Sequence, residues 1–172
     1  MRGRHDKDIY VDAPRQQDRA AHSAVSMTDL EQMLMQQEGT GPMRDGKFFP
    51  YQDTEGIWTI GYGHNLEAKG IPSDIAMMLF KGDVADAIDA VRFNFSCYDT
   101  LSRPRQLVLV NMGFQFGKAG LAKWVRFIGA VHLGHYDDAA DHLLDSKVAR
   151  EQAPRRYKTL ARMMKDNTSE WL

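Results

Sequence analysis

Apolar residues recur at helical spacing along much of the chain. This periodicity predicts helices over about 28–38, 73–93, 104–116, 121–133, 136–145 and 154–165. Aromatic and β-branched residues between about 47 and 64 predict strands instead, and strands are expected nowhere else. The helix that begins at about 104 is apolar on nearly every side, which predicts the buried centre of the larger part of the fold. The pattern therefore predicts an α+β protein that is mainly α.

The first predicted helix carries signals at both of its ends. Thr28 and Glu31 have the spacing of a capping box, in which each side chain bonds the backbone N–H of the other residue. Gly39 is suited to end the helix, because glycine adopts a C-cap backbone at little cost. Between these signals lies an apolar stripe of Leu30, Met33 and Leu34. A short amphipathic helix is therefore expected to begin near Thr28.

Glu38 is the last residue of this predicted helix and follows Leu34 by four positions. That spacing places its carboxylate near the apolar stripe and at the negative end of the helix dipole. Burial and the dipole both disfavour a charged carboxylate, so Glu38 is a candidate general acid. The alternative is a solvated glutamate at a frayed helix end.

A second carboxylate lies in a predicted β-hairpin. Asp53 begins a turn that ends at Gly56, and the β-branched and aromatic run 57–60 follows it. At such a hydrated corner Asp53 is expected to stay ionised, and Thr59 on the returning strand can bring a hydroxyl or a water toward the same place. The alternative for Asp53 is a purely structural Asx-turn. Two carboxylates in unlike surroundings are the groups that hydrolysis of a glycosidic bond requires.

Three segments of the chain carry a recognisable pattern. Glu38 and Gly39 are followed at 51–64 by YQDTEGIWTIGYGH, the segment 111–117 reads NMGFQFG, and 152–156 reads QAPRR. Together they resemble the active-site signature, the central-helix motif and the late Gln-x-Pro-x-Arg segment of the phage-type lysozymes, the T-even phage endolysin group. The resemblance spans residues 28 to about 165. It implies a lysozyme-like two-lobe fold, with a small β-hairpin lobe and a larger helical lobe joined by a long helix.

The resemblance implies a peptidoglycan hydrolase that cleaves the β-1,4 bond between N-acetylmuramic acid and N-acetylglucosamine, with inversion at the anomeric carbon. It implies that Glu38 is the general acid, Asp53 the catalytic carboxylate and Thr59 the residue that helps to place the water. Inverting enzymes hold their carboxyl groups about 6.5–9.5 Å apart and retaining enzymes about 5–5.5 Å apart, and the wider separation is expected here. Two alternatives stay open: a lytic transglycosylase, which needs only the glutamate, and a non-catalytic wall-binding module of a phage particle.

The resemblance also assigns two supporting pairs. Arg156 is expected to pair with Glu38 across the cleft and to orient the acid. His64 is expected to form a salt bridge with Asp83 on the following helix. The second pair is expected to be structural.

Two further positions match substrate-binding residues on the central helix of the family. Gln115 would hydrogen-bond the sugar or its N-acetyl group, and Phe114 would line the cleft. The alternative for Phe114 is plain packing in the core, which its apolar neighbours favour as well.

The polar and apolar content of the chain changes along its length. The first 26 residues hold almost no large apolar groups and are expected to be a flexible polar extension. The lysozyme domain is then expected over 27–172, with a small lobe at about 39–72 and a helical lobe at about 84–172 that also includes the helix 28–38. Fourteen residues separate Glu38 from Asp53, more than the family pattern has, which predicts a longer loop at the cleft mouth.

The composition fits an enzyme that folds without covalent links. The 172 residues are 43% hydrophobic, which is enough for a substantial core, and a single cysteine excludes an internal disulfide. That cysteine, Cys97, is expected to be a small buried apolar residue, because no motif supplies a base that would make it a nucleophile.

Four neighbouring side chains could be drawn as a metal site: His132, His135, Asp137 and Asp138. Gly134 interrupts the helix between the two histidines, and the resemblance implies no metal. Neither a metal nor a cofactor is therefore expected.

The charge pattern does not favour a nucleic-acid partner. The formal net charge is −1, and seven Lys or Arg oppose three Asp or Glu over 147–172, but no aromatic stacking platform accompanies them. No membrane-spanning stretch and no signal peptide are recognisable. The expected partner is bacterial peptidoglycan. The protein is expected to be a monomer that waits in the host cytoplasm and depends on a membrane-permeabilising holin to reach the wall in the periplasm.

Overall fold

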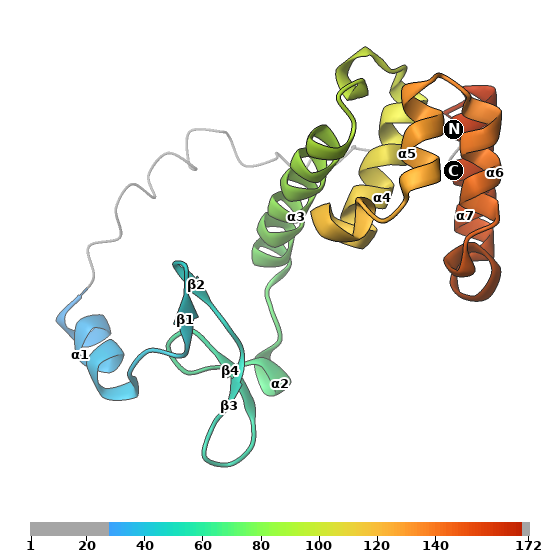
Figure 1. Cartoon of the computed structure of the whole chain (residues 1–172). Helices are drawn as coiled ribbons and strands as arrows, with labels where there is room; N and C mark the ends of the chain where they lie inside the picture. The colour runs from blue at the N-terminus through green and yellow to red at the C-terminus, as the bar shows by residue number, and fades with distance from the viewer. Residues whose placement is uncertain (1–27, 170–172) are drawn as a thin grey trace, which may run out of the picture. The chain divides into compact units, whose positions relative to one another are not determined.

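The computed structural model describes residues 28–169, and the predicted extension at 1–26 lies outside the described residues. The described chain divides into two compact units, residues 28–70 and 71–169 (Figure 1). The first carries all the strands of the described chain, and the second is built of helices. Many helices with two small antiparallel sheets confirm the predicted α+β fold. The predicted assignment of the helix 28–38 to the helical lobe stays a prediction.

Helix α1 (Asp29–Glu38) begins and ends where the sequence predicts. The Thr28 hydroxyl accepts a hydrogen bond from the Glu31 N–H (3.3 Å) and the Glu31 carboxylate accepts one from the Thr28 N–H (2.6 Å), so the capping box is confirmed. Gly39 follows with a φ of 71°, which glycine adopts without strain. No residue of α1 is buried, and Glu38 itself is exposed. Within its own unit the apolar stripe of α1 is solvent-exposed, so the burial expected around Glu38 stays a prediction.

An antiparallel sheet forms the centre of the first unit. Its strands lie in the order β3 (Tyr51–Gln52), β4 (Trp58–Ile60) and β5 (His64–Asn65). Thr59 is the central residue of the sheet, since it pairs with Tyr51 on one side and with Asn65 on the other. Gly56 has a φ of 81° and its N–H donates to the Asp53 carbonyl (3.0 Å), which closes the predicted tight turn.

A second hairpin precedes this sheet and corrects the predicted start of the strands. It consists of β1 (Met43–Arg44) and β2 (Lys47–Phe48), which pair only with each other. Asp45 and Gly46 form its two-residue turn with φ values of 47° and 73°, the combination that an Asp-Gly pair favours. The Phe49 N–H donates to the Pro42 carbonyl (2.9 Å) and closes the base of the hairpin. The longer loop predicted between Glu38 and Asp53 is therefore largely an ordered hairpin.

A single helical turn, α2 (Leu66–Lys69), follows β5 and lies outside the predicted helices. The Asn65 side chain accepts a hydrogen bond from the Ala68 N–H (2.8 Å) and so caps this turn. The turn ends at Gly70, which has a φ of 61°.

Helices make up the second unit. They are α3 (Ser73–Asn94), α4 (Arg103–Leu121), α5 (Val125–His132), α6 (Tyr136–Leu144) and α7 (Pro154–Asp166), with a 3₁₀ turn at Tyr98–Thr100 and a π turn at Val148–Gln152. Within this unit α4 packs against both α3 and α7, and α6 packs against both α5 and α7. No helix among residues 28–169 combines the length and the apolar character that crossing a bilayer would require.

Helix α4 lies at the centre of the core, as its apolar sequence predicts. Val108, Leu109 and Met112 are fully buried there. Phe114 is different, because 44% of its surface is exposed, so the alternative of plain core packing is wrong for this residue. Gly117, with a φ of 62°, breaks the helix near its end. Residues 118–121 continue α4 beyond this kink, so α5 begins at residue 125 and not at the predicted 121.

Candidate active site

Glu38 stands at the last position of α1, beside the turn that joins β4 to β5. A Cβ atom added to Gly63 in that turn would lie 3.5 Å from the Glu38 Oε2 atom, so the carboxylate rests against a residue that has no side chain. Gly63 has a φ of 78°, which most other residues adopt only with strain. The Glu38 carboxylate therefore lies in contact with this turn.

The backbone just after Glu38 is bound to the same turn. The Gly41 N–H donates to the Gly61 carbonyl at 2.8 Å. A Cβ atom on Gly41 would lie 2.7 Å from the Cε1 atom of Tyr51 and 3.0 Å from the Gly61 carbonyl oxygen, so this close approach requires glycine. The end of α1 is thereby attached to the sheet that carries Asp53 and Thr59.

Asp53 adopts the Asx-turn that the sequence left open as an alternative. Its Oδ1 atom accepts hydrogen bonds from the N–H groups of Glu55 and Ile57, each at 2.9 Å. The Asp53 N–H in turn donates to the Ile57 carbonyl (3.0 Å). These bonds use one carboxylate oxygen only. Among the described residues no hydrogen bond to Oδ2 is found, so the Asx-turn and a chemical role for the second oxygen are compatible.

Thr59 is a buried polar residue, with 4% of its surface exposed. Its hydroxyl donates to the Ile57 carbonyl at 3.2 Å, next to the backbone that holds Asp53. A hydroxyl that donates to a carbonyl keeps its oxygen available as an acceptor. Its role in placing a water stays a prediction.

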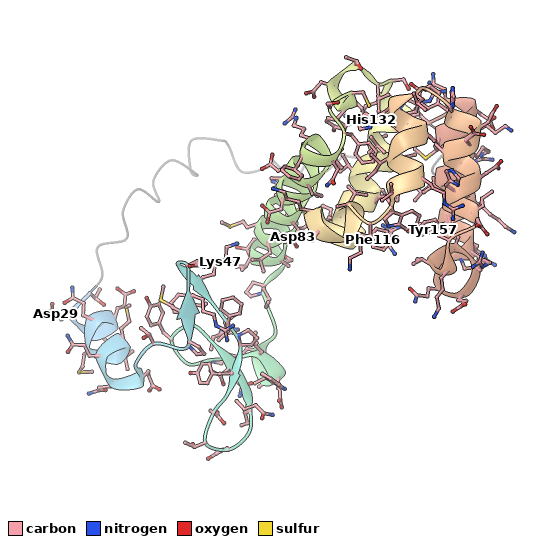
Figure 2. The ribbon with its side chains drawn as sticks, in the orientation of Figure 1. Asp29, Lys47, Asp83, Phe116, His132 and Tyr157 are labelled. Carbon is pink, nitrogen blue, oxygen red and sulfur yellow. The ribbon has the colours of Figure 1, made fainter. Side chains whose placement is uncertain are left out.

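Two neighbouring residues of α7 hold two residues of α4. Arg156 donates from Nε to the side-chain oxygen of Asn111 (2.8 Å) and from a terminal nitrogen to the Asn111 carbonyl (3.3 Å). The Tyr157 hydroxyl donates to the Oε1 atom of Gln115 at 2.9 Å. The family motifs in the sequence single out Arg156 and Gln115, whereas no motif marks Tyr157. The tyrosine is 0% exposed and lies inside the helical unit (Figure 2).

The pairs that would join the two units stay predictions. Arg156 was expected to pair with Glu38, and its bonds within its own unit go to Asn111. His64 was expected to pair with Asp83, and the Nε2 atom of His64 lies 2.7 Å from the Gly70 carbonyl in the first unit. Asp83 is an exposed residue of α3 (Figure 2).

Comparison of the chain with known proteins identifies its family. The family model described as phage lysozyme matches residues 45–162, which is more than half of the chain. The chain belongs to the phage lysozyme family. Membership indicates glycoside hydrolase activity on peptidoglycan. The matched segment includes Asp53, Thr59 and Arg156, whereas Glu38 lies before it.

Two curated relatives of this family member are distant in sequence. The pre-baseplate central spike protein Gp5 of Enterobacteria phage T4 is 28% identical over 138 residues, which are 64% of this chain and 23% of the spike protein. The probable T4-type lysozyme 2 of Dictyostelium discoideum is 26% identical over 149 residues, which are 70% of this chain and 84% of that protein. The chain therefore spans about a quarter of the spike protein and most of the amoebal lysozyme.

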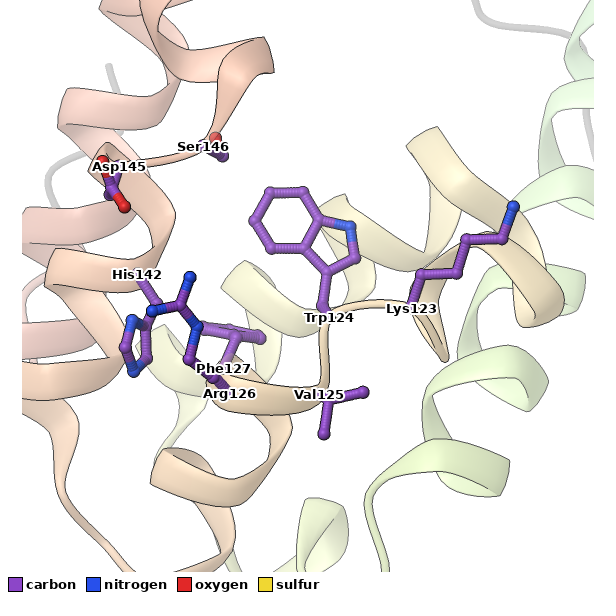
Figure 3. Close-up of a pocket in the computed structure, with 8 residues that line it drawn as sticks. All are labelled: Lys123, Trp124, Val125, Arg126, Phe127, His142, Asp145 and Ser146. Carbon is purple, nitrogen blue, oxygen red and sulfur yellow. The ribbon is translucent and has the colours of Figure 1, made fainter.

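A cavity of about 240 Å³ lies between the start of α5 and the end of α6 in this family member, and no sequence motif indicated it (Figure 3). Half-buried Trp124 forms one wall, and the side chain of Lys123 points away from the others. Asp145 is paired with Arg150 at 2.6 Å, whereas Arg126 and His142 have no ion pair among the described residues. The cavity wall therefore carries an arginine and a histidine as well as the indole ring.

The candidate metal cluster does not assemble in the described part of this phage lysozyme. The His135 Nδ1 atom lies 3.7 Å from an Asp138 carboxylate oxygen, and the His132 Nε2 atom lies 3.4 Å from the Ser96 hydroxyl. Within residues 28–169 no three His, Cys, Asp or Glu residues are grouped so that they could hold a metal ion.

Replacing Gly41 by alanine is expected to lower both the stability and the activity of this lysozyme. The new methyl group would overlap the Tyr51 ring and the Gly61 carbonyl, and such overpacking typically costs about 1–3 kcal/mol. Thermal unfolding followed by circular dichroism would measure the loss. Gly82→Ala is the matched control, because a Cβ atom there meets no atom within 4 Å and alanine favours the helix. Equal melting temperatures for wild type and Gly41→Ala would contradict the anchoring role of Gly41.

The stability of the fold is expected to fall as the pH rises above 10. Burial raises the pKa of Tyr157 to about 12, and the positive charge of Arg156 opposes this only in part. Between the ordinary pKa of 10.0 and about 12, the unfolded chain releases a proton that the folded chain keeps, so proton release favours unfolding. Denaturant unfolding at a series of alkaline pH values would measure the decline, and Tyr157→Phe should make it less steep. An equal decline in both proteins would show that Tyr157 is not its cause.

Proposed function

We propose that the chain is an N-acetylmuramidase that hydrolyses the β-1,4 bond between N-acetylmuramic acid and N-acetylglucosamine in bacterial peptidoglycan. In this proposal Glu38 protonates the oxygen of the leaving sugar, and Asp53 acts as the second carboxylate on a water that Thr59 helps to place. The mechanism is inverting. The observation that carries the proposal is the bond from Gly41 to Gly61, which attaches the end of α1 to the hairpin of Asp53 and Thr59.

The chemistry follows from the different settings of the two carboxylates. The Glu38 carboxylate lies at the C-terminal end of a helix, where the dipole disfavours an anion. The Asp53 carboxylate accepts two backbone N–H groups on one oxygen and keeps the other oxygen for a water or for the sugar. Thr59 is buried, and its hydroxyl donates to the Ile57 carbonyl. The N–H and the carbonyl of Ile57 are both hydrogen-bonded to Asp53 as well. One residue can therefore supply a proton while the other accepts one.

Digestion of purified peptidoglycan, followed by mass spectrometry of the released muropeptides, tests this function. A muramidase yields muramic acid at the reducing end, and proton NMR of the first products would show the inverted anomer. Anhydro-muramic ends would instead assign a lytic transglycosylase. Binding to the wall without any release would assign a non-catalytic wall-binding module of a phage particle.

The proposed setting is lysis of a bacterial host. The enzyme would collect in the host cytoplasm and reach the wall after a holin permeabilises the membrane. One relative is a baseplate spike protein by name, which supports a particle-associated role as the second candidate. Fractionation of infected cells and of purified particles distinguishes the two, because a free endolysin is absent from the particles.

A further inference from the structure

We propose that the Tyr157 hydroxyl is a positioning group that orients the side-chain amide of Gln115, so that its NH₂ group faces an N-acetyl carbonyl of the glycan. The inference rests on the proposed function, in which Gln115 binds the sugar. Tyr157 itself touches no substrate in this proposal. It acts through Gln115.

The contact between these residues is direct. The Tyr157 hydroxyl donates to the Oε1 atom of Gln115 at 2.9 Å. A glutamine amide carries an acceptor on one side and two donors on the other, and the two sides exchange when the amide rotates by half a turn. A phenol bound to Oε1 leaves the NH₂ group on the opposite side, and Gln115 is half-buried, so that group can still meet a ligand.

The phenol is itself held in place. Tyr157 is 0% exposed, and its ring stacks on Trp124 with centroids 6.2 Å apart and planes 13° apart. The preceding residue, Arg156, bonds both the side chain and the carbonyl of Asn111, which lies one helical turn before Gln115 on α4. The start of α7 therefore holds this face of α4 at two successive turns.

The ionisation of the phenol supports the donor role. Because burial raises the pKa of Tyr157 to about 12, the hydroxyl keeps its proton at any pH near neutrality. A protonated phenol can donate to the Gln115 carbonyl, whereas a phenolate could not.

The orientation of the amide matters for one class of ligand group. A sugar hydroxyl can donate or accept, so it would tolerate either orientation of Gln115. An N-acetyl carbonyl only accepts, and it would face a second acceptor if the amide were reversed. Removal of the phenol hydroxyl should therefore weaken glycan binding and leave the chemical step unchanged.

Kinetics with soluble glycan strands, freed of their stem peptides, would test the proposal. Tyr157→Phe is expected to raise KM by about fivefold, the effect of one hydrogen bond, with kcat within about twofold of wild type. Gln115→Ala should raise KM at least as much, and adding Tyr157→Phe to Gln115→Ala should change nothing further. Tyr98→Phe is the matched control, because Tyr98 is also buried and its hydroxyl makes no hydrogen bond within the described residues. It should leave KM unchanged.

A binding measurement separates this inference from the proposed function. Each variant is titrated against insoluble sacculi, which requires no turnover, and melting temperatures verify that each is folded. An inactive wild type would overturn the muramidase, while about fivefold weaker binding by Tyr157→Phe would still support the positioning role. In an active enzyme, two results would overturn the positioning role. The first is a folded Tyr157→Phe protein whose KM and binding constant equal those of wild type. The second is a Tyr157→Phe change that weakens binding equally in wild type and in Gln115→Ala.

Discussion

Glu38→Gln should abolish turnover of peptidoglycan and leave the fold intact. An amide cannot give a proton to the leaving oxygen, and general acid catalysis typically contributes about 10²–10⁴-fold to a rate. The side chain is exposed at the end of α1, so the change removes no core packing. Muropeptide release measured by mass spectrometry would give the rate, and circular dichroism would follow the melting temperature.

The control for this change lies in the same unit. Glu55 is exposed in the turn after Asp53, and only its backbone takes part in the Asx-turn. Glu55→Gln therefore removes the same charge and should keep full activity. A Glu38→Gln protein with activity near wild type would show that the general acid is another residue.

Asp53→Asn should lower the rate of hydrolysis by about 10²-fold or more, because an amide is a poor base for the attacking water. The fold should tolerate the change well. The side-chain oxygen of asparagine can accept the N–H groups of Glu55 and Ile57 just as Oδ1 of Asp53 does, so the Asx-turn survives. The same muropeptide assay gives the rate, and denaturant unfolding gives the stability.

Asp45→Asn is the matched comparison for Asp53. Asp45 is exposed in the turn between β1 and β2, where a φ of 47° suits asparagine as well as aspartate. Its activity and stability should match those of wild type. If Asp53→Asn were also near normal, and anhydro-muramic ends appeared among the products, the transglycosylase would replace the muramidase.

Local signals in the sequence predicted much of the fold. The capping box of Thr28 and Glu31 and the C-cap at Gly39 depend on residues within one helical turn, so spacing alone was sufficient for α1. The Asp-Gly pair at 45–46 carried an equally local hairpin signal. On sequence alone the pair is predicted to lie in a loop, because the strands on either side are only two residues long.

Contacts between distant segments could not be predicted in the same way. The bond from Tyr157 to Gln115 joins residues 42 positions apart, and no pattern at that range is visible in one sequence. The exposure of Phe114 likewise depends on which face of α4 its neighbours cover. The family signature singled out Glu38, Asp53 and Thr59 as the reactive groups. It gave no information on the Gly41 contact that attaches α1 to their hairpin.

The hairpin of β1 and β2 is closed at its base by the bond from Phe49 to Pro42, and neither strand pairs with the three-stranded sheet. The two ends of this insertion therefore already lie next to each other. Such a segment can be exchanged as a cassette, with a shorter turn or a foreign loop in its place, while the pairing of β3, β4 and β5 is kept. It offers a position at which the protein's contacts with different cell walls could be varied while the residues proposed to be catalytic are kept.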